Sequence, residues 1–192
     1  MREFLESSRY IDWQTPEVRG LALDLAANAE SEEEVARRCF HWVRDEVVHS
    51  LDHERDPVTC RASDVLRFRT GYCFAKSHLL AALLRANEIP AGLCYQRLRL
   101  DDKGAAFCLH GLNAVRLSDH GWFRVDPRGN KADIHCEFNP PTESLAYSCS
   151  EEGETFLNSM YSAPLPEIVD LLESSQSYGE VARRLEESDR MR

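Results

Sequence analysis

The chain has 192 residues, of which 43% are hydrophobic and 29% are charged, and its formal net charge is −10. This length and composition indicate one soluble globular domain over residues 1–192, large enough to bury a hydrophobic core. The acidic balance argues against nucleic-acid binding, which normally needs a basic surface stripe, and the sequence has no apolar run approaching the roughly 18–20 residues that span a bilayer.

The cysteines are scattered and include no C-x-x-C pair. They are Cys39, Cys60, Cys73, Cys94, Cys108, Cys136 and Cys149. Their number is odd, and the N-terminus MREFLESSRY lacks the basic and apolar regions of a secretory signal. We therefore expect reduced thiols in a cytoplasmic protein, with neither a disulfide framework nor a structural zinc site, and we expect no cofactor.

Helices are predicted throughout the first half of the chain. The first begins at Thr15, a hydroxyl N-cap followed by proline at the first helical position. The second begins at Ser31, which forms a capping box with Glu34. A short helix is expected around residues 63–68, and a longer, deeply buried helix begins near Cys73 and ends before the proline at position 90.

After that helix the apolar period becomes alternating, which favours strands. The predicted strands are residues 93–100, 107–117 and 121–125. Turn signals separate them at residues 101–104 and 118–121. Helices followed by an antiparallel sheet make an α+β protein. From residue 139 the pattern is looser, and two short amphipathic helices are expected near residues 167–172 and 178–185.

Cys73 is the one cysteine at a predicted helix start. A helix N-terminus presents unpaired N–H groups and partial positive charge, and both stabilise a thiolate. Gly71, two residues earlier, would allow a substrate to approach the backbone closely. The alternative interpretation is that Cys73 is a small buried residue in a helix cap.

His110 and Asp126 lie on two predicted strands joined by a hairpin, so their side chains can come together across the sheet. Taken alone, His110 could be an ordinary sheet residue and Asp126 a turn residue before proline. With Cys73 they supply a nucleophile, a base and a group that orients the base. The three residues together therefore indicate a cysteine-based catalytic triad.

Three segments resemble the transglutaminase-like superfamily, in that family's order. They are 71–92, similar to its nucleophile helix, 110–114, similar to its histidine strand, and 122–128, similar to its acid strand. The resemblance covers about residues 30–135. It implies a papain-like fold in which the nucleophile helix packs on an antiparallel sheet, with residues 139–192 as a C-terminal extension of loops and short helices.

The resemblance also implies chemistry through a thioester on a peptide or protein substrate. Cys73 would attack an amide carbonyl, His110 would protonate the leaving amine, and water or a second amine would resolve the thioester. The backbone N–H of Cys73 is the natural first oxyanion donor, whereas Gln96 and Trp42 are only guesses for the second. The superfamily includes transamidases, proteases, deglycosylating amidases and inactive relatives.

Several alternatives remain open at this stage. A cysteine protease could use the same triad, and a noncatalytic binding module could keep the same fold. Arylamine acetyltransferases share the triad and the general fold, but nothing here points to their acetyl-coenzyme donor. Cys108 is a weaker candidate nucleophile because it lies mid-strand. His49 and His53 have metal-ligand spacing with Cys60 nearby, but a solvated loop is the favoured interpretation.

Overall fold

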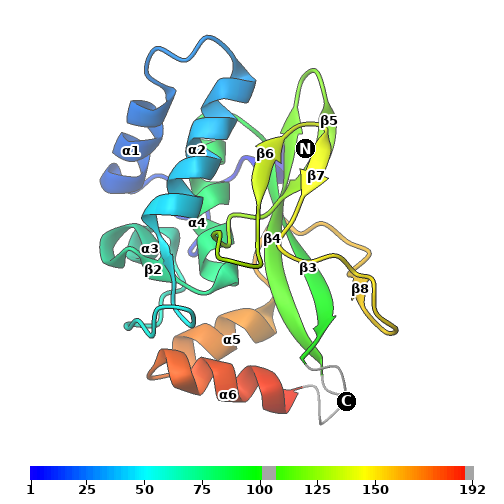
Figure 1. The fold of residues 1–192 in the computed structure, drawn as a ribbon. Coiled ribbons are helices and arrows are strands. Elements are labelled where there is room, and N and C mark those ends of the chain that lie inside the picture. Colours follow the sequence, from blue (N-terminus) through cyan, green and yellow to red (C-terminus); the bar gives the residue numbers. More distant parts are fainter. Residues whose placement is uncertain (101–106, 189–192) are drawn as a thin grey trace.

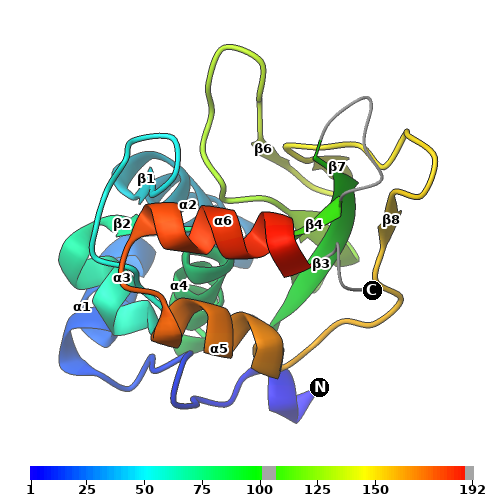
Figure 2. The same ribbon diagram turned by 90° about the horizontal axis from the view of Figure 1, so that it is seen from below.

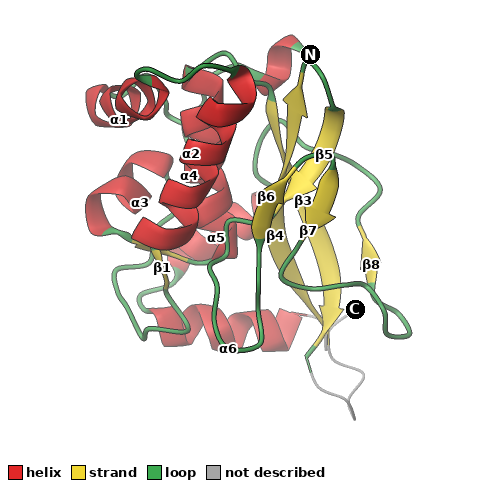
Figure 3. Cartoon of the chain, turned by 45° about the horizontal axis from the view of Figure 1, so that its top comes forward, coloured by secondary structure: helices red, strands yellow, loops and turns green. Residues whose placement is uncertain are grey.

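The computed structural model describes residues 1–100 and 107–188, and it has a helical layer on one side of a curved sheet (Figures 1 and 3). Four helices precede the sheet. They are α1 (Pro16–Ala26), α2 (Glu32–Glu46), α3 (Ala62–Phe68) and α4 (Cys73–Ala86). A short 3₁₀ turn, Arg2–Phe4, opens the chain. In the described ranges, no helix combines the length and the apolar character needed to cross a membrane.

The helix starts confirm the predicted boundaries, but the caps differ in detail. At α2 the Glu34 amide donates to Ser31 Oγ over 3.1 Å, whereas the Glu34 carboxylate accepts from the amide of Glu30 rather than that of Ser31. At α1 the Thr15 hydroxyl donates to the carbonyl of Asp12 and does not cap the helix, so that part of the prediction is wrong. The proline that follows Thr15 is enough to start α1.

Helix α4 lies at the centre of the molecule. Every residue from Cys73 to Arg85 is buried, because α1, α2 and α3 pack on one side of the helix, and strands β3 (Ala91–Arg99) and β4 (Phe107–Leu117) pack on the other. A helix that is surrounded in this way must be apolar on nearly all faces, which explains why α4 is rich in leucine and alanine. The predicted packing of the nucleophile helix on the sheet is therefore confirmed.

The main sheet is antiparallel, with strand order β5-β4-β3-β8. Its strands are β3 (Ala91–Arg99), β4 (Phe107–Leu117), β5 (Gly121–Val125) and β8 (Thr155–Phe156). The bounds of β4 and β5 match the prediction, and β3 begins two residues earlier than predicted. The turn expected at 101–104 lies outside the described residues. These elements confirm the α+β class.

Two small sheets were not predicted. Strand β1 (Val48–His49) pairs in parallel with β2 (Thr70–Gly71), and β6 (Glu137–Asn139) pairs with β7 (Thr142–Ser144). Strands of two or three residues are too short to show a period, and the partner of β1 comes from a distant segment. His49, which was expected in a loop, therefore ends a strand, and the C-terminal extension contains strands as well as helices.

Helices α5 (Pro166–Ser174) and α6 (Tyr178–Ser188) lie across the end of α4 that carries Cys73 (Figures 1 and 2). A hydrogen bond of 2.6 Å from the Tyr72 hydroxyl to the carbonyl of Tyr178 fixes α6 to the residue that precedes α4. This arrangement confirms both predicted C-terminal helices and places them next to the predicted nucleophile.

Candidate active site

The sheet brings His110 and Asp126 together. Val125 at the end of β5 pairs with Asn113 on β4, so Asp126 comes diagonally opposite His110 on the same face. The His110 Nε2 atom lies 2.7 Å from Asp126 Oδ2. His110 is 4% exposed and Asp126 is fully buried, which makes this a water-excluded contact.

Cys73 reaches the same place from α4, of which it is the first residue. The amide of Gly111 donates to Cys73 Sγ over 3.4 Å, and the His110 side chain hydrogen-bonds Cys73 as well. Because Asp126 occupies His110 Nε2, the ring nitrogen left for the sulfur is Nδ1. The structure therefore brings together the three residues that the sequence analysis selected.

Gly111 is what allows α4 and β4 to approach so closely. A Cβ atom at this position would lie 2.6 Å from Phe74 Cδ1 and 3.1 Å from Phe74 Cα. Backbone atoms at that distance cannot move aside without separating the helix from the strand. The glycine after the histidine thus makes room for helix α4.

The charges of the three residues reinforce one another. Burial alone disfavours an imidazolium, but the negative charges of Asp126 and Cys73 raise the pKa of His110 to about 10. Burial likewise disfavours the Asp126 carboxylate, yet His110 and two backbone amides lower its pKa overall. The donors are the amides of Arg128, 3.1 Å from Oδ1, and Ala146, 3.1 Å from Oδ2. A protonated His110 is therefore stable beside the sulfur.

Ala146 contacts Asp126 and Tyr147 contacts His110, and no sequence pattern indicated either residue. The Tyr147 ring meets the His110 ring edge-on, with centroids 5.0 Å apart. Its carbonyl accepts from Gln96 Nε2 over 3.0 Å. These residues belong to an aperiodic loop, so a lone tyrosine in a polar segment was the only signal available.

The two guesses for a second oxyanion donor are not supported by their contacts. Gln96 pairs with His110 in the β3–β4 register, but its Nε2 donates to the carbonyl of Tyr147 and to Cys149 Sγ. Trp42, on α2, lies under the guanidinium of Arg69 at 4.3 Å. The backbone amides at the start of α4 remain, because no side chain caps that helix.

Residues 19–127 match the family model of the transglutaminase-like superfamily. This match covers more than half of the chain. The chain belongs to the transglutaminase-like superfamily. A comparison with curated proteins found no match.

Two solved structures are similar to this chain in fold. A candidate cysteine protease from Cytophaga hutchinsonii is 21% identical, with a TM-score of 0.52 over 65% of this chain and 40% of its own. The periplasmic domain of TgpA from Pseudomonas aeruginosa is 23% identical, with a TM-score of 0.50 over 65% of this chain and 45% of its own. The chain thus spans less than half of each solved chain, and at this identity the likeness shows the fold alone.

A second group of charged residues lies beside His110 and Asp126, and it comes from β1, the loop after β1 and the segment after β5. Asp52 forms a bidentate ion pair with Arg128, with Nη1–Oδ2 and Nη2–Oδ1 distances of 2.7 and 3.1 Å. His49 Nδ1 lies 3.5 Å from Asp52 Oδ2, and its ring packs edge-on against Tyr72 with centroids 5.5 Å apart. Burial and then the charge of Arg128 lower the pKa of His49 to about 3.

The metal hypothesis for His49 and His53 finds no support. His49 is buried rather than solvated, so the loop interpretation was wrong for this residue, whereas His53 is exposed. Within residues 1–100 and 107–188, no group of three or more His, Cys, Asp or Glu side chains could hold a metal ion.

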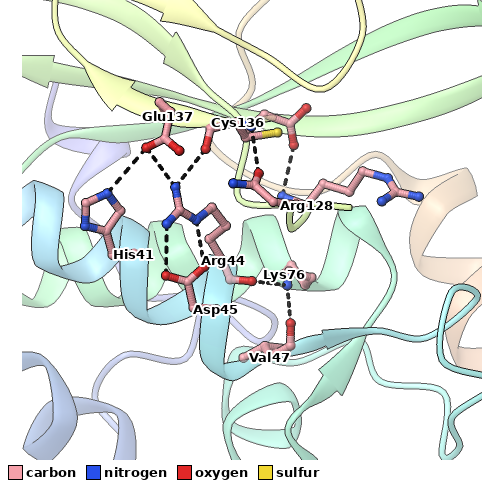
Figure 4. Close-up of polar contacts among 10 residues, drawn as sticks. His41, Arg44, Asp45, Val47, Lys76, Arg128, Cys136 and Glu137 are labelled. Carbon is pink, nitrogen blue, oxygen red and sulfur yellow. Dashed lines mark hydrogen bonds and ion pairs between the residues drawn. The ribbon is translucent and has the colours of Figure 1, made fainter. Parts of the chain in front are cut away.

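Lys76 is fully buried one turn after Cys73 and caps the end of α2 (Figure 4). Its Nζ donates to the carbonyls of Arg44, at 3.3 Å, and Val47. These carbonyls form the negative end of the α2 dipole, which offsets part of the cost of burying an ammonium. Burial and then Arg128 lower the pKa of Lys76 to about 7. Arg128, Lys76 and His49 line a cavity of about 250 Å³.

The remaining candidates behave as structural residues. His78, on α4, is completely buried, and its Nδ1 lies 2.7 Å from the carbonyl of Cys60, so it packs as a structural helix residue. All seven cysteines lie among the described residues, and none forms a disulfide there. Burial raises the pKa of Cys60 and Cys39 to about 12, which makes them poor nucleophiles.

Proposed function

We propose that this chain is a cysteine-dependent enzyme that transfers or hydrolyses the acyl group of an amide bond in a peptide or protein, through a thioester on Cys73. The observation that carries the proposal is the contact of His110 with both Asp126 and Cys73 in a water-excluded site. Membership of the transglutaminase-like superfamily supports a cysteine-dependent enzyme and a peptide or protein substrate.

The first half-reaction follows from this geometry. The sulfur of Cys73 attacks the amide carbonyl, and the carbonyl electrons move onto oxygen. The oxyanion is held by the first amides of α4, which carry the positive end of the helix dipole. His110 then gives its proton to the leaving nitrogen, the C–N bond breaks and a thioester remains.

The second half-reaction reverses the proton transfers. Neutral His110 takes a proton from water or from a primary amine as that nucleophile attacks the thioester, and the thiolate leaves. Asp126 keeps the imidazole in one orientation through both halves, because its carboxylate is itself fixed by two backbone amides. Water as acceptor gives hydrolysis, whereas an amine gives transamidation.

The test uses p-nitrophenyl acetate, which acylates a reactive thiolate and releases a coloured product. The wild-type chain and a Cys108→Ala control should release p-nitrophenolate at the same rate, and Cys73→Ala should release it only at the background rate. Cys108 is the matched control because it lies on β4 two residues before His110. An unchanged rate in Cys73→Ala would overturn the proposal.

A second measurement separates the two reactions. The chain is incubated with a labelled primary amine and a glutamine-bearing protein. Incorporation of the amine identifies a transamidase, and new chain termini identify a protease. If Cys73 is no more reactive toward iodoacetamide than the other cysteines, and neither product forms, the chain is a noncatalytic binding module with this fold.

A further inference from the structure

The loop between β7 and β8 contacts both the base and the acid, yet the triad chemistry gives it no role. The Ala146 amide donates to Asp126 Oδ2 over 3.1 Å, and the same oxygen faces His110 Nε2. The Tyr147 ring packs edge-on against the His110 ring. Ala146 and Tyr147 are partly exposed, whereas the two residues that they contact are buried. Residues 146–149, here called the clamp, therefore help to exclude water from the base and the acid.

Gln96 holds the clamp in place. It lies on β3 directly opposite His110 on β4, and directly opposite residues of two antiparallel strands share one face of the sheet. The Gln96 Nε2 atom donates to the carbonyl of Tyr147 over 3.0 Å and to Cys149 Sγ over 3.4 Å. One fully buried amide therefore fixes two residues of the clamp to the face of the sheet that carries the base.

Stability alone does not account for a buried amide at this position. The Gln96 Oε1 atom is buried and has no hydrogen-bond partner among the described residues. Burying a polar atom without a partner costs more free energy than a typical neutral hydrogen bond contributes, and an apolar side chain of similar length would avoid this cost. What the amide supplies is therefore the place at which its N–H groups hold the clamp.

We propose that Gln96 is a positioning residue for His110 and that it acts through the clamp. The proposal rests on the proposed function, because His110 is the base of that reaction. Through the Tyr147 ring, the clamp limits rotation of the imidazole, so that its two nitrogens stay aligned with the sulfur and with the carboxylate. A misplacement of only about 1 Å at such a group can lower a reaction rate about 100-fold.

The first experiment compares single and double variants in the p-nitrophenyl acetate assay. Gln96→Met removes the amide at nearly equal length, and Tyr147→Ala removes the ring. Each should lower kcat about tenfold and leave KM within about twofold of the wild type, because the base and not the substrate is misplaced. The double variant should also lose about tenfold rather than about 100-fold, because both changes disable the same clamp. Tyr147→Phe, which keeps the ring, should recover the rate lost in Tyr147→Ala.

A matched control is Arg97→Met, at the next position of β3. Arg97 Nη1 donates to the carbonyl of Gly153 over 2.8 Å, so this variant also breaks a contact between β3 and the loop that precedes β8. Successive residues of a strand face opposite sides of the sheet, so Arg97 points away from His110. The kcat and KM of this variant should equal those of the wild type.

The second experiment needs no substrate. NMR of the full chain follows the proton on His110 Nε2, which is assigned by its loss in His110→Gln. The 2.7 Å contact with Asp126 in a water-excluded site should make this proton slow to exchange with solvent. It should exchange about tenfold faster in Gln96→Met and in Tyr147→Ala, because a loosened clamp opens the site to water, and at the wild-type rate in Arg97→Met.

Three kinetic results would overturn the proposal. A wild-type kcat in Gln96→Met would mean that the base needs no clamp. A raised KM with an unchanged kcat would assign Gln96 to substrate binding instead. A loss of about 100-fold in the double variant would mean that Gln96 acts independently of Tyr147.

Two measures keep the outcome decisive. If Gln96→Met does not fold, Gln96→Asn takes its place, because its amide is one carbon short of the Tyr147 carbonyl. If the wild type cleaves no ester, the proposed function fails, and proton exchange still decides whether Gln96 positions His110. An exchange rate that is the same in the wild type and in Gln96→Met would overturn the positioning role.

Discussion

Two imidazoles lie near the start of α4, His110 on the sheet side and His49 on the loop side, and they are almost equally buried at 4% and 7% exposure. Their environments nevertheless shift their pKa values in opposite directions, to about 10 for His110 and about 3 for His49. Burial disfavours the charged form of both rings. The difference between them must therefore come from the neighbouring charges.

The deciding factor is whether the nearest carboxylate is already engaged by another cation. Among the described residues, the hydrogen-bond donors to Asp126 are His110 and neutral backbone amides, so the carboxylate charge is available to the ring. Asp52 is 3.5 Å from His49 but is bound by both arms of Arg128, and Lys76 adds a further positive charge nearby. His110 on the sheet side is therefore favoured in its protonated form, whereas His49 on the loop side is favoured as a neutral ring.

Asp126→Asn would break this comparison most severely, because it removes the charge that distinguishes His110 from His49. We expect the fold to survive, since asparagine has the same shape and its single carbonyl oxygen can keep one of the two contacts with backbone amides. The rate of p-nitrophenyl acetate cleavage should fall roughly 10³- to 10⁴-fold, because the imidazole loses its orientation and its proton affinity. Glu143→Gln, which removes a carboxylate paired with Arg124, should change the rate little. A fully active Asp126→Asn variant would remove Asp126 from the triad.

The second prediction concerns stability in alkaline solution. A histidine with a raised pKa in the folded state contributes stability that is complete below its unfolded pKa, about 6.5, and is lost as the pH rises toward 10. The slope is at most about 1.4 kcal/mol per pH unit. Lys76 acts in the opposite direction. Its pKa is lowered from 10.5 to about 7 in the folded state, so between these two pH values the unfolded chain binds more protons than the folded one. The free energy of unfolding therefore rises with pH in this range.

These two slopes partly cancel, so the wild-type curve alone is not informative. Urea unfolding of the wild type and of His110→Gln, compared from pH 6.5 to pH 10, isolates the histidine. The stability difference between them should shrink as the pH rises. A constant difference would mean that His110 does not hold a proton in this range.

The sequence predicts the sheet side of the site well and the loop side poorly. The cysteine at a helix start and the hairpin that joins His110 to Asp126 are local patterns, and the bounds of β4 and β5 follow from alternation together with the turn signals beside the strands. The pairing of Arg128 with Asp52 joins segments far apart in the chain, and neither residue has a periodic context. Tyr147 and the short strand β1 are missed for the same reason, since their positions depend on tertiary packing.

The smallest effect is expected in acid, on the loop side. A neutral buried His49 with a folded pKa of about 3 costs stability once the unfolded chain begins to bind a proton, so stability falls as the pH drops below about 6.5. His49→Phe keeps a ring against Tyr72 and removes this titration. Between pH 7 and pH 5, the free energy of unfolding of this variant should fall by roughly 1–2 kcal/mol less than that of the wild type.

The control is His53→Ala, in the same loop but exposed, whose free energy of unfolding should change with pH as that of the wild type does. The stability of the folded protein also falls in acid because of three other groups with lowered pKa values, Asp52, His78 and Asp126. Only the difference between His49→Phe and the wild type therefore reports on His49. Parallel curves for these two proteins would mean that His49 is charged in the folded state, and the contrast with His110 would then be lost.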